Sequence, residues 1–252
     1  MIALDRVSLS FGQVEAVRAV SLDVPEGAFT VLIGESGSGK TTTLHLINRL
    51  IEPSEGRVLI AGEDARAQDP VGLRRGMGFI FQAIGLFPHM TVAENVGITP
   101  RLLGWPKQKI AARVDELLDL VRLPPAEFRN RRPSELSGGQ RQRVGLARAL
   151  AASPKIMLMD EPFGALDPLT RDELSAEYRA IHERLGLTTV LVTHDMTEAL
   201  LLADTIAVMR DGQIVQTGTP KELLAAPADD FVRGLIETPK RRAALLAKAV
   251  AP

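Results

Sequence analysis

Short apolar runs separated by polar, glycine-rich or proline-rich segments recur along the chain. Runs this short predict strands that are buried on both faces, as in a parallel sheet. Two of the runs are followed directly by acids or a histidine. Because the carboxyl ends of parallel strands lie at one edge of a sheet, these residues are predicted to lie at that edge. The runs comprise residues 29–33, 77–81, 156–159 and 189–193.

Other segments predict antiparallel structure and a helical insertion. Residues 2–11 and 58–60 predict strands of an antiparallel layer, and residues 14–33 predict another pair. The Asp211-Gly212 turn between residues 207–209 and 213–215 predicts a hairpin. From residue 83 to 152 glycines and prolines interrupt the pattern, and apolar residues then recur at helical spacing within residues 110–121. This segment is predicted to be a helical arm inserted in the core.

Composition excludes several classes of protein. The 252 residues include 30 Lys and Arg against 31 Asp and Glu, so the net charge of −1 gives no general attraction to nucleic acid. The chain has no cysteine, which excludes disulfides, thiol catalysis and cysteine-ligated zinc. No apolar run approaches the ~20 residues that span a bilayer, and the first residues lack a signal pattern. We expect the chain to be soluble by itself.

The run Gly34-Glu35-Ser36-Gly37-Ser38-Gly39-Lys40-Thr41 lies between an apolar run and a helix-like segment. This setting predicts a phosphate-binding loop, because glycines let backbone N–H groups turn inward around an anion. Lys40 can reach the β and γ phosphates, the Thr41 hydroxyl can ligate Mg²⁺, and the helix that starts near Lys40 adds its positive end. A plain glycine- and serine-rich connector is the alternative. The flanking strand and helix favour ATP or GTP binding.

The apolar run 156–159 ends in Asp160-Glu161. At the carboxyl end of a buried strand, Asp160 is placed to hold Mg²⁺ through water and Glu161 to orient the attacking water. The alternative is that the pair only terminates the strand, which Pro162 also suits. Together with the upstream loop, the pair favours catalysis.

The run 189–193 ends in His194-Asp195. The imidazole there can donate to a γ-phosphate oxygen, a contact that distinguishes ATP from ADP. Asp195 or Thr193 capping a following helix is compatible with this role. The other histidines, His45, His89 and His182, have no partner at metal-ligand spacing.

Residues 136–140, Leu-Ser-Gly-Gly-Gln, precede the helical run 141–152 and predict a second anion-binding site. One chain does not usually need two binding sites for a γ-phosphate. A second site therefore suggests that two chains share two nucleotides. With Lys40, Asp160, Glu161 and His194 in this order, the chain resembles the ATP-binding-cassette (ABC) family, whose signature motif reads as residues 136–140 do.

The resemblance covers almost the whole chain and implies further roles. Phe11 matches an adenine-stacking aromatic, although a core role is the alternative for an isolated aromatic. Gln82 matches the glutamine that joins the Mg²⁺ and the attacking water to the membrane subunit, and Ala165-Leu166-Asp167 matches a loop that contacts the opposite subunit. The implied catalytic residues are Glu161, His194 and Gln82, and the implied metal site comprises Thr41, Gln82 and Asp160. The implied nucleotide-binding residues are Phe11, Gly34, Ser36, Gly37, Ser38, Gly39, Lys40, Thr41, Thr42, Asp160, Ser137, Gly138, Gly139 and Gln140.

The predicted fold is α/β, a P-loop nucleotidase core with an antiparallel β layer and an inserted α-helical arm. We expect a RecA-like nucleotide-binding core at residues 1–82 and 153–220. The arm, with the glutamine loop and the signature motif, is expected at 83–152. A helical tail is expected at 221–252, where a frayed terminal helix is favoured over contact with a membrane or partner.

The resemblance implies a homodimeric ATPase that closes around two ATP with Mg²⁺ and drives integral membrane permease subunits. It would act at the cytoplasmic face of the membrane, with an extracytoplasmic solute-binding protein as an indirect partner. Residues 84–95, 41–44 and 47–50 look like the quaternary-amine and osmoprotectant branch of bacterial importers, which takes up glycine betaine, choline or carnitine. The exposed loop 84–92 would then be a socket for a helix of the membrane partner.

Three alternatives remain open from the residues. The cassette could serve an importer for another solute, such as an amino acid. It could be a soluble cassette protein of DNA repair or translation, but the long coiled-coil insertions, zinc modules or second cassette of such proteins are missing. A P-loop kinase would leave residues 136–140 unexplained. An arginine cluster is interpreted as a solvated face around the signature helix, without nucleic acid; it comprises Arg129, Arg131, Arg132, Arg141 and Arg143.

Overall fold

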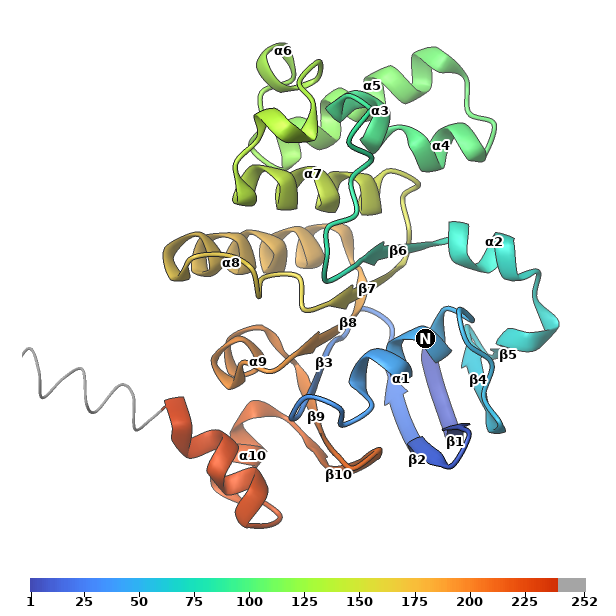
Figure 1. Ribbon diagram of the computed structural model, residues 1–252, viewed down its shortest axis with the longest axis vertical. Coiled ribbons are helices and arrows are strands. Elements are labelled where there is room, and N and C mark those ends of the chain that lie inside the picture. Colours follow the sequence, from blue (N-terminus) through green and yellow to red (C-terminus); the bar gives the residue numbers. More distant parts are fainter. Residues whose placement is uncertain (240–252) are drawn as a thin grey trace, which may run out of the picture. The chain divides into compact units, whose positions relative to one another are not determined.

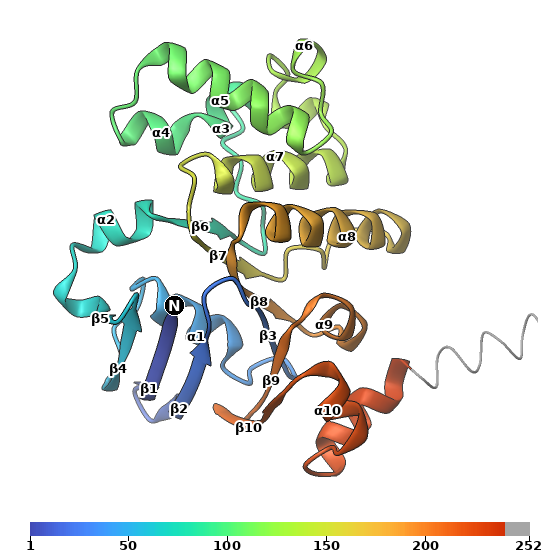
Figure 2. The ribbon, with the colours of Figure 1, turned by 180° about the vertical axis from the view of Figure 1, so that it is seen from behind.

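The computed structural model describes residues 1–239, which form parts of two compact units (Figures 1 and 2). The first unit contains residues 1–64 and the chain from Val190 onward, and the second contains Ala65–Thr189. The two units are described separately. β8 (Thr188–Thr193) begins in the second unit and continues into the first.

The first unit contains an antiparallel sheet and strands of a second sheet, several of them buried. Its elements are β1 (Ile2–Phe11), β2 (Val14–Val24), β3 (Phe29–Ile33), α1 (Lys40–Ile47), β4 (Glu55–Ile60), β5 (Glu63–Asp64), α9 (Met196–Leu202), β9 (Thr205–Arg210), β10 (Gln213–Gly218) and α10 (Pro220–Ala225). One sheet has the order β2-β1-β4-β5, and β10, β9, β3 and β8 are neighbours in that order in the other. Residues 230–239 are helical, whereas the predicted tail from residue 240 lies outside the described residues.

Most strand predictions in this unit are confirmed, including the β9–β10 hairpin around Asp211-Gly212. The expected pair within residues 14–33 is wrong, since β2 pairs with β1 while β3 runs parallel to β9. All five residues of β3 are buried, whereas β2 alternates between buried and exposed positions. Burial on both faces suits an inner strand of a parallel sheet, which explains why β3 leaves the antiparallel layer.

A β-bulge interrupts the pairing of β1 with β4. The register shifts between Asp5 and Ser8, and Arg6 there has a φ of 48°. Gly56 faces this bulge with a φ of +75°, and a Cβ on it would lie 2.3 Å from the Arg6 carbonyl oxygen. The bulge therefore requires glycine at this position, because the obstacle is backbone.

Gly56→Ala is expected to lower the free energy of unfolding by about 3 kcal/mol, from steric overlap added to the cost of a positive φ. Gly62→Ala is the matched control: its φ is +87°, but nothing lies within 4 Å of its added Cβ. The control should lose only about 1 kcal/mol. Urea unfolding curves measure both variants, and equal losses would show that the contact with Arg6 is unimportant.

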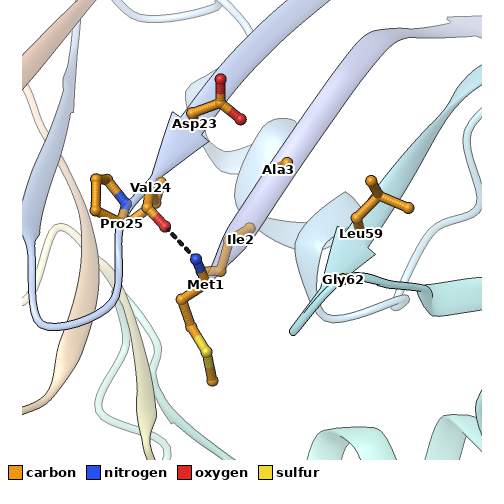
Figure 3. A pocket seen from close by; sticks show the side chains of 8 residues that line it. All are labelled: Met1, Ile2, Ala3, Asp23, Val24, Pro25, Leu59 and Gly62. Carbon is orange, nitrogen blue, oxygen red and sulfur yellow. Dashed lines mark hydrogen bonds between the residues drawn. The ribbon is translucent and has the colours of Figure 1, made fainter.

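A small pocket opens at the edge of the same sheet (Figure 3). Its volume is about 260 Å³, and the N-terminal ammonium beside it donates to the Val24 carbonyl oxygen at 2.9 Å. The lining comes from the beginning of β1, the end of β2 and the β4–β5 turn; it comprises Met1, Ile2, Ala3, Asp23, Val24, Pro25, Leu59 and Gly62. None of these residues belongs to the predicted nucleotide site.

The second unit is mainly helical. It contains a 3₁₀ turn at Ala65–Ala67, α2 (Pro70–Arg75), β6 (Met77–Ile80), α3 (Val92–Val96), α4 (Ile98–Leu102), α5 (Lys107–Leu120), α6 (Pro125–Phe128), a 3₁₀ turn at Pro133–Glu135, α7 (Gly138–Leu150), β7 (Ile156–Asp160) and α8 (Pro168–Leu185). β6 and β7 are parallel, and α7 packs against β6, α3 and α5. The helix expected in residues 110–121 is confirmed, with Val114, Leu117 and Leu118 buried in α5. The division into core, arm and tail stays a prediction.

A buried polar cluster joins α8 to β8. The Thr189 hydroxyl lies 2.8 Å from the Tyr178 hydroxyl and 2.9 Å from Nδ1 of His182. Burial raises the pKa of Tyr178, so its hydroxyl stays protonated. His182 is 2% exposed. Its contact with Thr189 gives it a role in packing.

The predicted arginine cluster is less solvated than expected. Arg143 pairs with Glu177, and the two side chains are 15% and 14% exposed. Arg129 pairs with Asp115 at 3.1 Å, and Arg131 pairs with Glu127 at 2.7 Å. The Arg143 pair joins α7 to α8 and the Arg129 pair joins the end of α6 to α5, while Arg132 is exposed. The interpretation of the cluster as a face that binds no nucleic acid stays a prediction.

Candidate nucleotide-binding site

The phosphate loop connects β3 to α1 in the first unit. Gly37 and Gly39 have φ values of +82° and +99°, which favour glycine. A Cβ on Gly39 would lie 2.5 Å from the Ala16 carbonyl oxygen, and one on Gly34 would lie 2.1 Å from that of Met209. The loop is therefore a close-fitting backbone turn that larger residues would distort.

Lys40 is the first residue of α1 and is only 6% exposed. Its Nζ donates to the carbonyl oxygens of Gly34 at 2.8 Å and Glu35 at 2.7 Å, across the mouth of the loop. Thr41 beside it is exposed, and Thr42 is half-buried. A buried ammonium, a hydroxyl and the N-terminal amides of a helix form the donor set that suits a polyphosphate.

The β9–β10 hairpin supports this loop from a distant part of the sequence. Gly212 N–H donates to the Ser38 carbonyl oxygen at 3.2 Å, and the Met209 backbone packs against Gly34. In α1, the Thr43 hydroxyl donates to the Gly39 carbonyl oxygen at 2.9 Å. Sequence reasoning missed these supports, since a backbone carbonyl or amide carries no signal of its partner.

Phe11 and His194 both lie at strand ends in the first unit. The Phe11 residue is 54% exposed at the end of β1, so the alternative of a core residue is wrong. His194 is exposed directly after β8. An exposed aromatic ring can stack on a base, and an exposed imidazole can reach a ligand.

The turn that presents His194 is held by its neighbours. Asp195 caps α9 by accepting from the Thr197 N–H at 2.7 Å. The Thr193 hydroxyl accepts from Asp195 N–H at 3.0 Å and donates to the buried Glu198 carboxylate at 2.6 Å. Thr193 and Asp195, the two possible caps, thus both form hydrogen bonds in this turn. The part that Glu198 plays in it was not predicted from the sequence.

Asp160 and Glu161 follow β7 in the second unit. Asp160 is 5% exposed, and Glu161 has a left-handed φ of 43°, which costs energy for a non-glycine residue. The Gln82 Nε2 lies 3.4 Å from Oε2 of Glu161, so two of the predicted catalytic residues are brought together. Strain at a carboxylate beside an amide is typical of a functional site.

The signature residues begin α7. Ser137 Oγ accepts from Gln140 N–H at 3.2 Å, and Gln140 Oε1 accepts from Ser137 N–H at 2.9 Å, a complete capping box. A Cβ on Gly139 would lie 2.8 Å from Cγ2 of Thr170, beside the loop that contains Leu166. The exposed Ser137 hydroxyl can still donate its proton to a phosphate oxygen.

Asp167 also has a structural role. It caps α8 by accepting from Thr170 N–H at 3.1 Å, and this backbone hydrogen bond lowers the pKa of its carboxyl group. The expected contact of residues 165–167 with an opposite subunit stays a prediction.

The predicted magnesium site stays a prediction. Within residues 1–239, no three His, Cys, Asp or Glu side chains gather to hold a metal ion. Mg²⁺ usually binds through one or two protein oxygens, water and substrate phosphates. Thr41 and Asp160 provide oxygen donors of the right chemistry, and the loop geometry around Lys40 fits a nucleotide phosphate.

Comparison with protein families identifies the chain. The family model described as ABC transporter matches residues 17–164. The chain belongs to the ABC transporter family. The predicted α/β cassette fold is thereby confirmed: a dimeric ATP-binding cassette, MJ0796, solved in a post-hydrolysis state with ADP and phosphate, superposes with a TM-score of 0.78 at 35% identity, covering 87% of this chain and 99% of that one.

Curated relatives agree with this assignment. OpuCA of Bacillus subtilis, a glycine betaine/carnitine/choline transport ATP-binding protein, is 53% identical over 237 residues, covering 94% of this chain and 62% of that protein. YehX of Escherichia coli, from a glycine betaine uptake system, is 52% identical, covering 92% and 75%. CysA of Thermosynechococcus vestitus, a sulfate/thiosulfate import ATP-binding protein, is 50% identical, covering 93% and 69%. The ABC cassette thus spans about three fifths of OpuCA.

Proposed function

We propose that this ABC cassette is the ATP-hydrolysing subunit of an importer, and that it dimerises around two ATP at the cytoplasmic face of the membrane. The observation that carries the proposal is the phosphate loop, in which Lys40 is held between two carbonyl oxygens. Similarity to transport ATP-binding proteins over more than nine tenths of the chain supports it.

In this proposal Lys40, Thr41 and Thr42 bind the phosphates, and Phe11 stacks on the adenine. Ser137 and Gly139 of a second copy donate to the γ-phosphate across the dimer. Bound Mg²⁺ would neutralise phosphate charge, held by Thr41 and, through water or directly, by Asp160 and Gln82. Glu161 orients and deprotonates the attacking water, and His194 donates to the γ-phosphate. ATP then favours the closed dimer by contacts that ADP cannot make.

A membrane permease needs a docking surface on the cassette. Among the described residues, no helix has the length and apolar character to cross a membrane. The expected socket, loop 84–92, exposes Phe87, but Leu86 beside it is half-buried. The loop is therefore less exposed at Leu86 than expected.

A second candidate socket lies between α3, α4 and α5. This pocket has a volume of about 510 Å³, and both apolar and basic residues line it. Trp105 at its side is covered by Lys109, whose Nζ lies 4.0 Å from the ring centroid. The lining comprises Ala93, Glu94, Gly97, Arg101, Trp105, Lys107, Ile110, Ala111, Val114 and Arg129. A short amphipathic helix of a permease fits such a surface, and a solute-binding protein would contact only the permease.

The proposed cargo is a quaternary-amine osmoprotectant. Deletion of the gene in its source organism is expected to abolish uptake of labelled glycine betaine, choline or carnitine at high salt, because the permease loses its source of energy. Uptake is measured beside that of labelled sulfate and an amino acid, and complementation with the wild-type gene is the control. Normal uptake of every quaternary amine, with loss of another solute, would reassign the cargo. Normal uptake of all solutes would contradict an importer.

A further inference from the structure

The Arg148 side chain joins α7 to the segment that follows Gln82. Its Nη2 donates to the Ile84 carbonyl oxygen and its Nη1 to that of Gly85, each at 2.6 Å. These are short, charge-assisted hydrogen bonds to two consecutive carbonyl groups. The planar guanidinium makes the two bonds from separate nitrogens in a fixed geometry, whereas a lysine would have to make both from a single nitrogen.

Neighbouring residues are shaped for this contact. Gly145 lies one turn before Arg148, and a Cβ on it would lie 2.9 Å from Cγ2 of Ile84. The glycine therefore lets the Ile84 side chain lie directly on the helix. Gly85 has a φ of 61°, which its lack of a Cβ allows. Burial lowers the pKa of Arg148, but a guanidinium remains charged at neutral pH.

The same helix carries the signature motif. α7 begins at the Ser137 capping box and contains Arg148 in its last turn, so one continuous 13-residue helix joins the signature motif to Arg148. Gln82, two residues before Ile84, lies against Glu161. A short path of covalent and hydrogen bonds thus connects Glu161, Gln82, Arg148 and Ser137 within one unit.

We propose that Arg148 is a positioning residue, which holds the segment 83–85 on α7 and so keeps the Gln82 amide beside Glu161. Through this contact, the signature helix and the glutamine loop move together. The inference rests on the proposed ATPase function. It predicts that loss of Arg148 impairs hydrolysis, whereas ATP binding through Lys40 is retained.

Hydrogen exchange tests the contact without any catalytic assay. Arg148→Met should raise amide exchange in residues 83–87 by about tenfold, since two charge-assisted hydrogen bonds are lost. Arg148→Lys should give an intermediate value. Arg113→Met is the matched control, because Arg113 also donates to a backbone carbonyl in this unit, that of Leu150 at 3.1 Å. Unchanged exchange in Arg148→Met, or an equal rise in the control, would overturn the proposal.

Kinetics test the consequence. Arg148→Met should lower kcat by about tenfold at an unchanged KM for ATP, because misplacement of a catalytic group affects the chemical step. In combination with Gln82→Ala it should add little to the loss from Gln82→Ala alone, since both act through one amide. Fully additive losses would refute the positioning role.

Two further measurements distinguish failure of this proposal from misfolding of the variant and from failure of the proposed function. If Arg148→Met does not fold, Gly145→Ala replaces it: this variant keeps the guanidinium but displaces Ile84, and it must raise exchange in residues 83–87. Wild-type hydrolysis is measured first. An inactive wild type would contradict the proposed function, whereas the exchange experiment would still decide whether Arg148 holds the segment.

Discussion

Lys40→Ala is expected to weaken ATP binding by about 10²–10³-fold, because it removes a charge-assisted contact with phosphate. The Lys40 ammonium is almost fully buried and lies at the mouth of the loop, 2.8 Å from the Gly34 carbonyl oxygen and 2.7 Å from that of Glu35. A neutral methyl group there removes the only cation within residues 34–41. Isothermal titration calorimetry with Mg-ATP measures the change.

Lys109→Ala is the control for this result. Lys109 is an exposed lysine on α5 that covers Trp105, and its loss should leave ATP affinity unchanged. Thermal unfolding of both variants shows whether the fold is kept. Wild-type affinity in folded Lys40→Ala would refute the assignment of residues 34–41 as the phosphate loop.

Lys40→Ala also tests whether two chains share each nucleotide. Mixed with Ser137→Arg, it should form some dimers in which one composite site has both an intact loop and an intact signature motif. ATPase activity should then exceed that of either variant alone. An absence of recovery at every mixing ratio would contradict sites shared across the dimer.

The phosphate loop and the signature motif were predictable because their chemistry is local in sequence. Glycines at residues 37 and 39 adopt the positive φ values that the loop needs, and Ser137 and Gln140 form a capping box within four residues. The strand runs were predictable as well, because burial on both faces leaves a continuous apolar pattern. Apart from the pairing of β3, the pattern gave the right strand types.

Long-range support could not be predicted in the same way. Met209 supplies a backbone carbonyl to the wall beside Gly34, and Arg148 donates to the carbonyl oxygen of Ile84, 64 residues earlier. Every residue has a carbonyl group, so the sequence does not mark the acceptor. The Thr189 hydroxyl shared by Tyr178 and His182 is a similar case, since its partners are chosen by packing.

Glu161→Gln is expected to lower the hydrolysis rate by about 10²–10⁴-fold while ATP binding persists. The substitution keeps the shape of the side chain and its left-handed backbone, but an amide cannot accept a proton from the attacking water. The neighbouring Gln82 amide cannot replace it, because it lies beside the same atom, Oε2 of Glu161, and has no basic oxygen of comparable strength. Steady-state release of phosphate measures the loss.

If Glu161→Gln binds ATP but does not hydrolyse it, the variant should accumulate as a dimer. Because ATP stabilises the closed dimer and only hydrolysis reopens it, Glu161→Gln should elute as a dimer in size-exclusion chromatography with Mg-ATP and as a monomer with Mg-ADP. Glu173→Gln, at an exposed carboxylate of α8, should hydrolyse ATP like the wild type and accumulate no such dimer. If Glu161→Gln stays monomeric with Mg-ATP although calorimetry shows that ATP binds, dimer closure is not driven by ATP, and the coupling between nucleotide and transport must be sought elsewhere in the cassette.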